Sequence, residues 1–207
     1  LGVLAATKQY SRADYVITSV ALVGISLPTF FFASLLKLVF SVKLGWFDLF
    51  GLTGRNYEQL NAMGQFLDKA HHLVLPIITL VVISVGSLMR YTRTNMLEVL
   101  NADYIRTARA KGLREKVVVY SHAWRNALLP VITVLIGWFI SIFSGSLIIE
   151  QMFGLNGMGQ LYYQGLMNND YELALAIQMF YVLIALVGQL ITDLSYGIVD
   201  PRVRVNK

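Results

Sequence analysis

The sequence lacks cysteine and carries little charge. None of its 207 residues is a cysteine, which excludes a disulfide framework and thiolate chemistry. Only 14% of the residues are charged, against roughly a quarter in an ordinary soluble domain. Together with 56% hydrophobic residues and a mean hydropathy of +0.59, this deficit indicates that lipid rather than water surrounds most of the chain.

Several patterns that carry chemistry are also missing. No GxxxxGK[ST] loop is present, so the chain has no usual cradle for nucleotide phosphates. His71 and His72 are adjacent and no HExxH pattern occurs, so we expect no metal site. The long apolar stretches hold no paired carboxylates or histidines, so we expect no catalytic residues and no enzyme activity. The formal charge of +5 forms no basic stripe with interleaved aromatics, so no nucleic-acid partner is expected.

Four apolar stretches are long enough to cross a bilayer, which takes about 20 residues of helix. They cover residues 15–36, 73–89, 127–149 and 173–192. Helices are expected because every backbone polar group in lipid must be satisfied within its own segment. The sequence therefore predicts an all-α, polytopic transmembrane helix bundle that forms one domain over residues 1–207.

Basic residues are distributed unevenly among the segments that join these stretches. Thirteen of the 17 precede the first stretch, lie between the second and third, or follow the fourth. The other four lie between the first and second stretches, and residues 150–172 hold none. Because Lys and Arg collect on the cytoplasmic side, residues 1–14, 90–126 and 200–207 are expected in the cytoplasm. Residues 38–72 and 150–172 are then expected to face outward.

Three features inside the stretches predict local structure. Pro28 lies in the middle of the first stretch and removes a backbone hydrogen bond, which predicts a kink. Gly137, Ser141 and Gly145 are spaced four apart, so the third stretch is expected to present a small-residue face to another helix. Lys37 lies near the outer end of the first stretch, where its long side chain can reach the interface.

Two glutamines on the fourth stretch are candidates for a pathway. Gln178 and Gln189 are eleven residues apart, close to three helical turns, so they share one face. Polar side chains in a span avoid lipid. The pair could line a translocation cavity or could bond between helices, and the sequence favours neither.

The segment between the second and third stretches, residues 93–126, is the most informative. Residues 102–111 are predicted to form a short helix, with Asn101 as its N-cap and Gly112 as its C′ residue. Ten residues are fewer than the roughly 12–15 that an isolated helix needs in water. We therefore expect its apolar face to dock against something, although a solvated amphipathic helix is the alternative. That face consists of Ala102, Ile105 and Ala108.

Stretches along almost the whole chain are similar, in order, to one known family. Ala108–Gly112 (ARAKG) and His122–Pro130 (HAWRNALLP) resemble the cytoplasmic signature loop of binding-protein-dependent ABC importer permeases. The phrase Asp103–Leu113 (DYIRTARAKGL) is similar to the branch of that family for dipeptides, oligopeptides and nickel. At Arg106 the sequence departs from the general signature, which has glutamate there. Further similar stretches are residues 24–30, 40–46, 150–159 and 200–202.

The resemblance implies a fold and a site. The family has the type I ABC importer permease fold with six spans, and this chain would be a fragment with the last four. The signature loop of the family forms a coupling helix that sits in a cleft of the ATPase subunit. By resemblance, ten consecutive residues form this coupling site here. They are Asp103, Tyr104, Ile105, Arg106, Thr107, Ala108, Arg109, Ala110, Lys111 and Gly112.

The resemblance also implies partners and a location. The expected partners are ABC ATPase subunits, a second permease subunit, an extracytoplasmic substrate-binding protein and the lipid bilayer. ATP and Mg²⁺ would bind to the ATPase subunits, so no cofactor is expected on this chain. The location implied is the inner membrane of a bacterial or archaeal cell, crossed several times.

The function that the resemblance favours is a permease subunit of an ATP-driven importer for dipeptides or oligopeptides. Import of nickel, glutathione or another small solute by the same family is the alternative. A passive channel would need no capped cytoplasmic helix, so the loop of residues 93–126 argues against that function.

Overall fold

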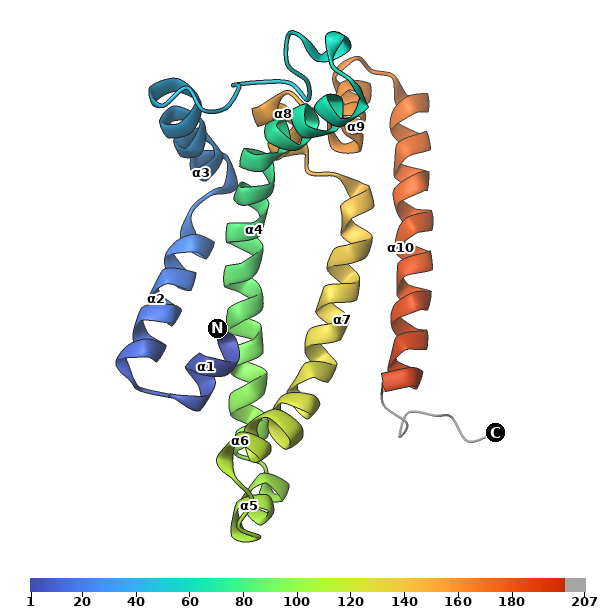
Figure 1. The fold of residues 1–207 in the computed structure, drawn as a ribbon. Helices are drawn as coiled ribbons and strands as arrows, with labels where there is room; N and C mark the ends of the chain where they lie inside the picture. Colours follow the sequence, from blue (N-terminus) through green and yellow to red (C-terminus); the bar gives the residue numbers. More distant parts are fainter. Residues whose placement is uncertain (200–207) are drawn as a thin grey trace. The chain divides into compact units, whose positions relative to one another are not determined.

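The structure, a computed structural model, is built of helices (Figure 1). It describes the backbone of residues 1–199 and the side chains of residues 1–194, and within this part every regular element is a helix. The predicted all-α class is therefore confirmed. The main helices are α1 (Gly2–Thr7), α2 (Arg12–Ser26), α3 (Thr29–Leu36), α4 (Ala62–Leu100), α5 (Asp103–Ala110), α6 (Glu115–Val117), α7 (Arg125–Ser141), α8 (Leu147–Phe153), α9 (Met158–Met167) and α10 (Tyr171–Val199).

Shorter helical turns join some of these elements. Two are π-helical, and both continue directly from an α-helix: Lys37–Lys43 follows α3, and Val118–Trp124 joins α6 to α7. Two are 3₁₀ turns, Tyr57–Gln59 and Ile142–Ser144. The predicted cytoplasmic tail and the family-like stretch at residues 200–202 lie outside the described residues.

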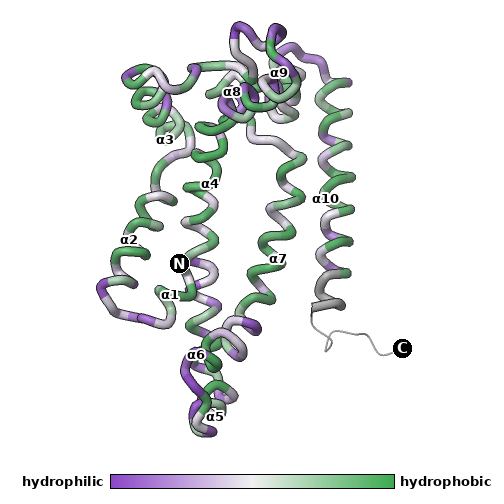
Figure 2. The backbone as a smooth tube through the Cα atoms, viewed as in Figure 1, coloured by the Kyte–Doolittle hydropathy of each residue, from purple (hydrophilic) through white to green (hydrophobic). Residues whose placement is uncertain are grey.

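Within the described residues, three continuous helical segments are long and apolar enough to cross a membrane. They are Ala62–Leu100, Glu115–Ser144 and Tyr171–Leu194, and their middle parts are largely hydrophobic (Figure 2). The predicted spans 73–89 and 173–192 lie inside the first and third of these. A fourth span is obtained only if α2 and the helix Thr29–Lys43 are counted together.

The first predicted span, 15–36, is not one kinked helix but two helices. α2 ends at Ser26, and α3 begins at Thr29 directly after Pro28, whose φ and ψ are −57° and 136°. Proline lacks an N–H, and its ring also disfavours the helical conformation for the residue before it, here Leu27. The two effects together end the helix rather than bend it.

The third predicted span, 127–149, also differs from the structure. The helix begins earlier, because α6, the π-helical turn and α7 are continuous from Glu115, and it ends at Ser144. Gly145 then has φ of +71°, a left-handed conformation that ends the helix, and α8 begins two residues later. The apolar residues of α8 continue the hydrophobic run of the sequence beyond Ser144, and for this reason the predicted span ended too late.

The chain forms two compact units. One contains Leu1–Ile25, Ser84–Ile140 and the described residues from Ala185, and the other contains Ser26–Ile83 and Ser141–Ile184. We refer to them below as the loop unit, which holds residues 93–126, and the turn unit, which holds the segment 145–170.

Close helix packing in the loop unit depends on glycines that the sequence pattern did not single out. A Cβ on Gly86 of α4 would lie 3.0 Å from Ile25 of α2, and one on Gly188 of α10 would lie 2.6 Å from Ile140 of α7. The predicted small-residue face is not continuous: Gly145 lies outside the helix, and a Cβ on Gly137 would meet no other part of the chain within 4 Å. Spacing shows that small residues share a face but not whether a neighbour covers it.

In the turn unit, Glu150 holds the connection between α8 and α9. Its side chain is buried and accepts backbone hydrogen bonds from Ser146 (2.9 Å) and Gln160 (2.7 Å). Three glycines crowd this carboxylate, so that any Cβ there would overlap it or the adjacent backbone. They are Gly145, Gly157 and Gly159. A carboxylate that accepts backbone N–H groups satisfies donors that would otherwise be buried without partners.

Replacing Gly157 by alanine is expected to destabilise the turn unit by about 1–3 kcal/mol, the usual cost of overpacking. The new Cβ would overlap the Glu150 carboxylate, although the extended backbone of Gly157 (φ −112°) itself suits alanine. The matched control is Gly137→Ala. It adds a methyl group at an open surface position in the middle of α7, and it should leave the stability unchanged or raise it slightly. Thermal unfolding of the two variants in detergent measures the difference, and equal unfolding temperatures would contradict this assignment.

Lys37 does not extend to the interface as predicted. It is buried in the turn unit, donates a hydrogen bond to the backbone carbonyl of Met152 at the end of α8, and lies 3.6 Å from the ring centre of Phe50. A cation near the last carbonyls of a helix is favourable, and so is a cation over an aromatic face. Lys37 therefore links the start of the π-helical turn Lys37–Lys43 to the end of α8 and to Phe50.

Candidate functional site

The predicted coupling residues form α5 (Asp103–Ala110), followed by Lys111 and Gly112. α5 lies at the end of the loop unit, next to α6 (Figure 1). The predicted helix of residues 102–111 agrees with the structure to one residue at each end, which is within the normal variation of helix boundaries.

The C-terminus of α5 is closed by a complete Schellman motif. Gly112 has φ of +75°, its N–H bonds to the carbonyl of Arg109 at 2.9 Å, and the N–H of Leu113 bonds to that of Ala108 at 3.4 Å. This is the pattern in which a left-handed C′ residue satisfies the last free carbonyls of a helix. The predicted position of Gly112 as the C′ residue is confirmed. Leu113 also takes part in the motif, which the sequence pattern did not indicate.

The N-terminus of α5 differs from the prediction. The N-cap position belongs to Ala102, which has no side-chain acceptor. Asn101 donates its side-chain amide to the carbonyl of Leu97 at 2.9 Å, so it closes the end of α4 instead. Since Asn101 lies between two helices only two residues apart, its side chain could serve either one, and sequence alone does not distinguish them.

One face of α5 is buried against the chain itself. Ile105 is fully buried and Ala108 is 7% exposed, while Ala102 is partly buried. The cluster that covers them comes from α1, α4, the π-helical turn and α7, and it consists of Ala6, Met96, Val118, Val119, Ala123 and Ala127. The expected docking of this apolar face is therefore satisfied within the loop unit. Burial of one isoleucine side chain contributes about 1.5–3 kcal/mol.

The opposite face of α5 is open. Tyr104 is 48% exposed and Leu113 is 41% exposed, so two large apolar side chains stand on the surface of this loop. Eight of the ten predicted coupling residues are exposed: Asp103, Tyr104, Arg106, Thr107, Arg109, Ala110, Lys111 and Gly112. Exposed aromatic and arginine side chains together are typical of surfaces that bind another protein.

An ion pair joins α5 to the start of α6. Arg109 donates two hydrogen bonds to the carboxylate of Glu115, from Nη2 at 2.9 Å and from Nε at 3.3 Å. These bonds raise the pKa of Arg109. Both side chains are well exposed, so the ion pair adds little to the stability of the fold. Its effect is to orient the connection between α5 and α6.

The two glutamines proposed for a pathway both lie on α10, where they are exposed. Gln189 donates a hydrogen bond to Asp193 one turn later at 2.9 Å. The structure thus gives Gln189 a partner on its own helix, and the role of both residues in a pathway stays a prediction.

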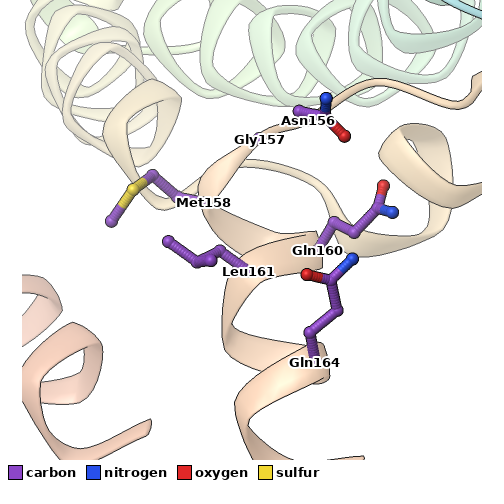
Figure 3. Close-up of a pocket in the computed structure, with 6 residues that line it drawn as sticks. All are labelled: Asn156, Gly157, Met158, Gln160, Leu161 and Gln164. Atoms are coloured by element: carbon purple, nitrogen blue, oxygen red, sulfur yellow. The ribbon is translucent and has the colours of Figure 1, made fainter. Parts of the chain in front are cut away.

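The turn unit holds a pocket of about 370 Å³ along one end of α9 (Figure 3). The amides of Gln160 and Gln164 lie close together on one side of the helix, and Met158 and Leu161 lie on the other (Figure 3). Gln160 Oε1 is buried and has no hydrogen-bond partner. The remaining lining residues are Asn156 and Gly157. This pocket falls in the segment 150–172 that was predicted to face outward.

Comparison with known proteins decides the family. The sequence profile described as "Binding-protein-dependent transport system inner membrane component" matches residues 1–205. The chain belongs to this family. The resemblance found in the sequence is thereby confirmed.

Curated relatives agree with the family assignment. The chain is 44% identical over 202 residues to the Oligopeptide transport system permease protein AppB of Bacillus subtilis. It is 39% identical over 203 residues to the Oligopeptide transport system permease protein OppB of Haemophilus influenzae, and 39% identical over 207 residues to the Dipeptide transport system permease protein DppB of Bacillus subtilis. Each alignment covers at least 98% of this chain and 62% of the relative.

Proposed function

We propose that the protein is the membrane-spanning permease subunit of an ATP-driven peptide importer, in the inner membrane of a bacterial or archaeal cell. The observation that carries the proposal is α5, a short helix that is held by its own chain on one side and open on the other, in the loop predicted to be cytoplasmic. The names of the relatives, which are oligopeptide and dipeptide transport permeases, support peptides as the cargo.

The packing of α5 suits it to transmit a movement. Ile105 and Ala108 share one buried cluster with Met96 of α4 and Ala127 of α7. Since a close-packed cluster resists deformation, a partner that displaces α5 would also displace the ends of these two long helices. α5 in this proposal is a lever between an ATPase subunit and the spans, and the ATP and Mg²⁺ are bound by that subunit.

The rest of the mechanism follows an alternating-access scheme. A substrate-binding protein delivers peptide to the outer side, closure of the ATPase subunits moves α5, and the helices open toward the cytoplasm. A second permease subunit completes the pathway. Gln178 and Gln189 are proposed to line it, and the pocket at Gln160 is a candidate surface for the binding protein.

The proposal predicts which cargo stimulates ATP hydrolysis. The complete transporter, reconstituted in liposomes, is supplied with its binding protein loaded either with mixed short peptides or with nickel. We expect peptides to raise the hydrolysis rate several-fold and nickel to leave it at the basal level. The ATPase subunit should co-purify with the permease.

Other outcomes separate the alternatives. Stimulation by nickel alone would keep the family and overturn the cargo. Uptake of peptide without ATP hydrolysis would indicate a passive channel. If neither cargo stimulates hydrolysis and the ATPase subunit does not co-purify, the role of α5 as a coupling helix is contradicted.

A further inference from the structure

His72, in the turn unit, has a side chain that is fixed in one tautomer and only 3% exposed. Its Nδ1 lies 2.8 Å from the backbone carbonyl oxygen of Asp68, one turn earlier in α4. A carbonyl oxygen can only accept a hydrogen bond, so Nδ1 carries the proton. The lone pair of the neutral imidazole is then on Nε2.

Nε2 of His72 faces a carboxylate. It has no hydrogen-bond partner and lies 3.1 Å from Oδ2 of Asp48. A nitrogen lone pair and a carboxylate oxygen repel each other at this distance unless a proton or a metal ion lies between them. The Asp48 side chain is 63% exposed, so a cation can reach the pair from solvent.

His71 supplies a third donor at the same place. Its ring stacks on Phe47, the neighbour of Asp48, with centroids 4.6 Å apart and planes 19° from parallel. Ligand atoms of Asp48, His71 and His72 all lie within 4.8 Å of one another. A shared proton would account for His72 and Asp48, but it gives no reason for a second imidazole to converge on them.

We propose that Asp48, His71 and His72 form a binding site for a divalent transition-metal ion of the zinc class. Two imidazoles and one carboxylate are ligands that Zn²⁺ accepts, and three protein ligands leave a position for water or another donor. The hydrogen bond from His72 Nδ1 to a backbone carbonyl is the contact that orients a metal-binding histidine. The site belongs to the segment 38–72, which is predicted to face outward, so a metal bound there would be taken from outside the cell.

The sequence spacing gave no reason to expect this site. Adjacent histidines on a helix point about 100° apart, and Asp48 lies far away along the chain. Only the fold of the segment before α4, which places Phe47 on His71, brings the carboxylate to both rings. The site is separate from the proposed coupling loop, and its test does not depend on transport.

Titration of Zn²⁺ into the complete protein tests the proposal. The protein is purified in detergent, its affinity tag is removed, and it is treated with chelator before calorimetry. We expect one zinc ion per chain, and at least about a tenfold loss of affinity in Asp48→Asn and in His72→Gln. Asp48→Asn changes an exposed side chain, so it remains informative if the buried His72→Gln variant does not fold.

His122→Gln is the matched control, because it removes the remaining histidine of the chain, from a segment in the loop unit. It should bind zinc like the wild type. Visible absorption of bound Co²⁺ gives a second readout, and its bands should be lost in the same two variants. Absence of zinc binding by the wild-type protein overturns the proposal, and so does unchanged binding in Asp48→Asn.

Discussion

Replacing Gly112 by valine is expected to lower substrate-stimulated ATP hydrolysis of the assembled transporter by up to about tenfold. Gly112 has φ of +75°, and a residue with a Cβ costs about 1–2 kcal/mol there, more when it is β-branched. About 1.4 kcal/mol corresponds to a tenfold change in a population. The Schellman hydrogen bonds at the end of α5 would then form in a smaller share of the molecules, and the exposed face of α5 would lose its fixed shape.

The cause of this loss is backbone conformation and not lack of space. A Cβ on Gly112 would meet nothing within 4 Å, so no clash contributes. Gly112→Asn is therefore the matched control, because asparagine adopts the left-handed conformation more readily than other residues with a side chain. We expect Gly112→Asn to keep most of the stimulation. Normal stimulation in Gly112→Val would contradict the coupling role of α5, whereas equal loss in both variants would indicate that the side chain itself disturbs the contact.

Local features of the chain could be predicted well from the sequence. The end of α5 depends on a single glycine after a helical pattern, and this signal lies within a few residues. The apolar residues of α4 and α10 are numerous enough to mark both spans. Pro28 was correctly seen as a disturbance, but whether a proline bends a helix or ends it depends on contacts elsewhere in the structure, which spacing does not contain.

Features that depend on distant parts of the chain could not be predicted. Glu150 is buried by glycines that lie on both sides of it in the sequence, and it is the only acidic side chain between residues 146 and 169. His72 needs Asp48, and the apolar face of α5, although expected to dock, is covered by Val118 and Ala123, which the sequence did not indicate. In each case the residue type is ordinary in its local sequence, and only tertiary contacts give it a role. The proposed coupling residues rest on a family resemblance, because an exposed helix face carries no periodic signal of its partner.

Removing the carboxylate of Asp14 is expected to destabilise the loop unit by about 3–5 kcal/mol, the usual cost of leaving a buried charge without its partner. Asp14 is only 3% exposed, and it accepts two hydrogen bonds of 2.8 Å from Arg93, at Nε and Nη2. It also accepts bonds from the backbone of Tyr10 and the hydroxyl of Thr18. In Asp14→Ala all these donors lose their acceptor. The temperature of thermal unfolding in detergent should fall by on the order of 10 °C.

Two further variants separate the buried charge from simple loss of contacts. Asp14→Leu combined with Arg93→Met removes both charges, and it should recover much of the stability, because an apolar pair often replaces a buried ion pair without loss. Asp103→Ala breaks the exposed contact with Arg106 at 3.5 Å, and it should leave the unfolding temperature unchanged.

Arg93 lies one turn of α4 before Met96, which packs in the cluster under α5. If Asp14→Ala lowers stability as expected, the same variant should also weaken coupling, since the cluster that holds α5 rests on this part of α4. If Asp14→Ala unfolds at the wild-type temperature, water must solvate the guanidinium of Arg93 in the variant. The ion pair between Asp14 and Arg93 would then not be what holds α2 against α4.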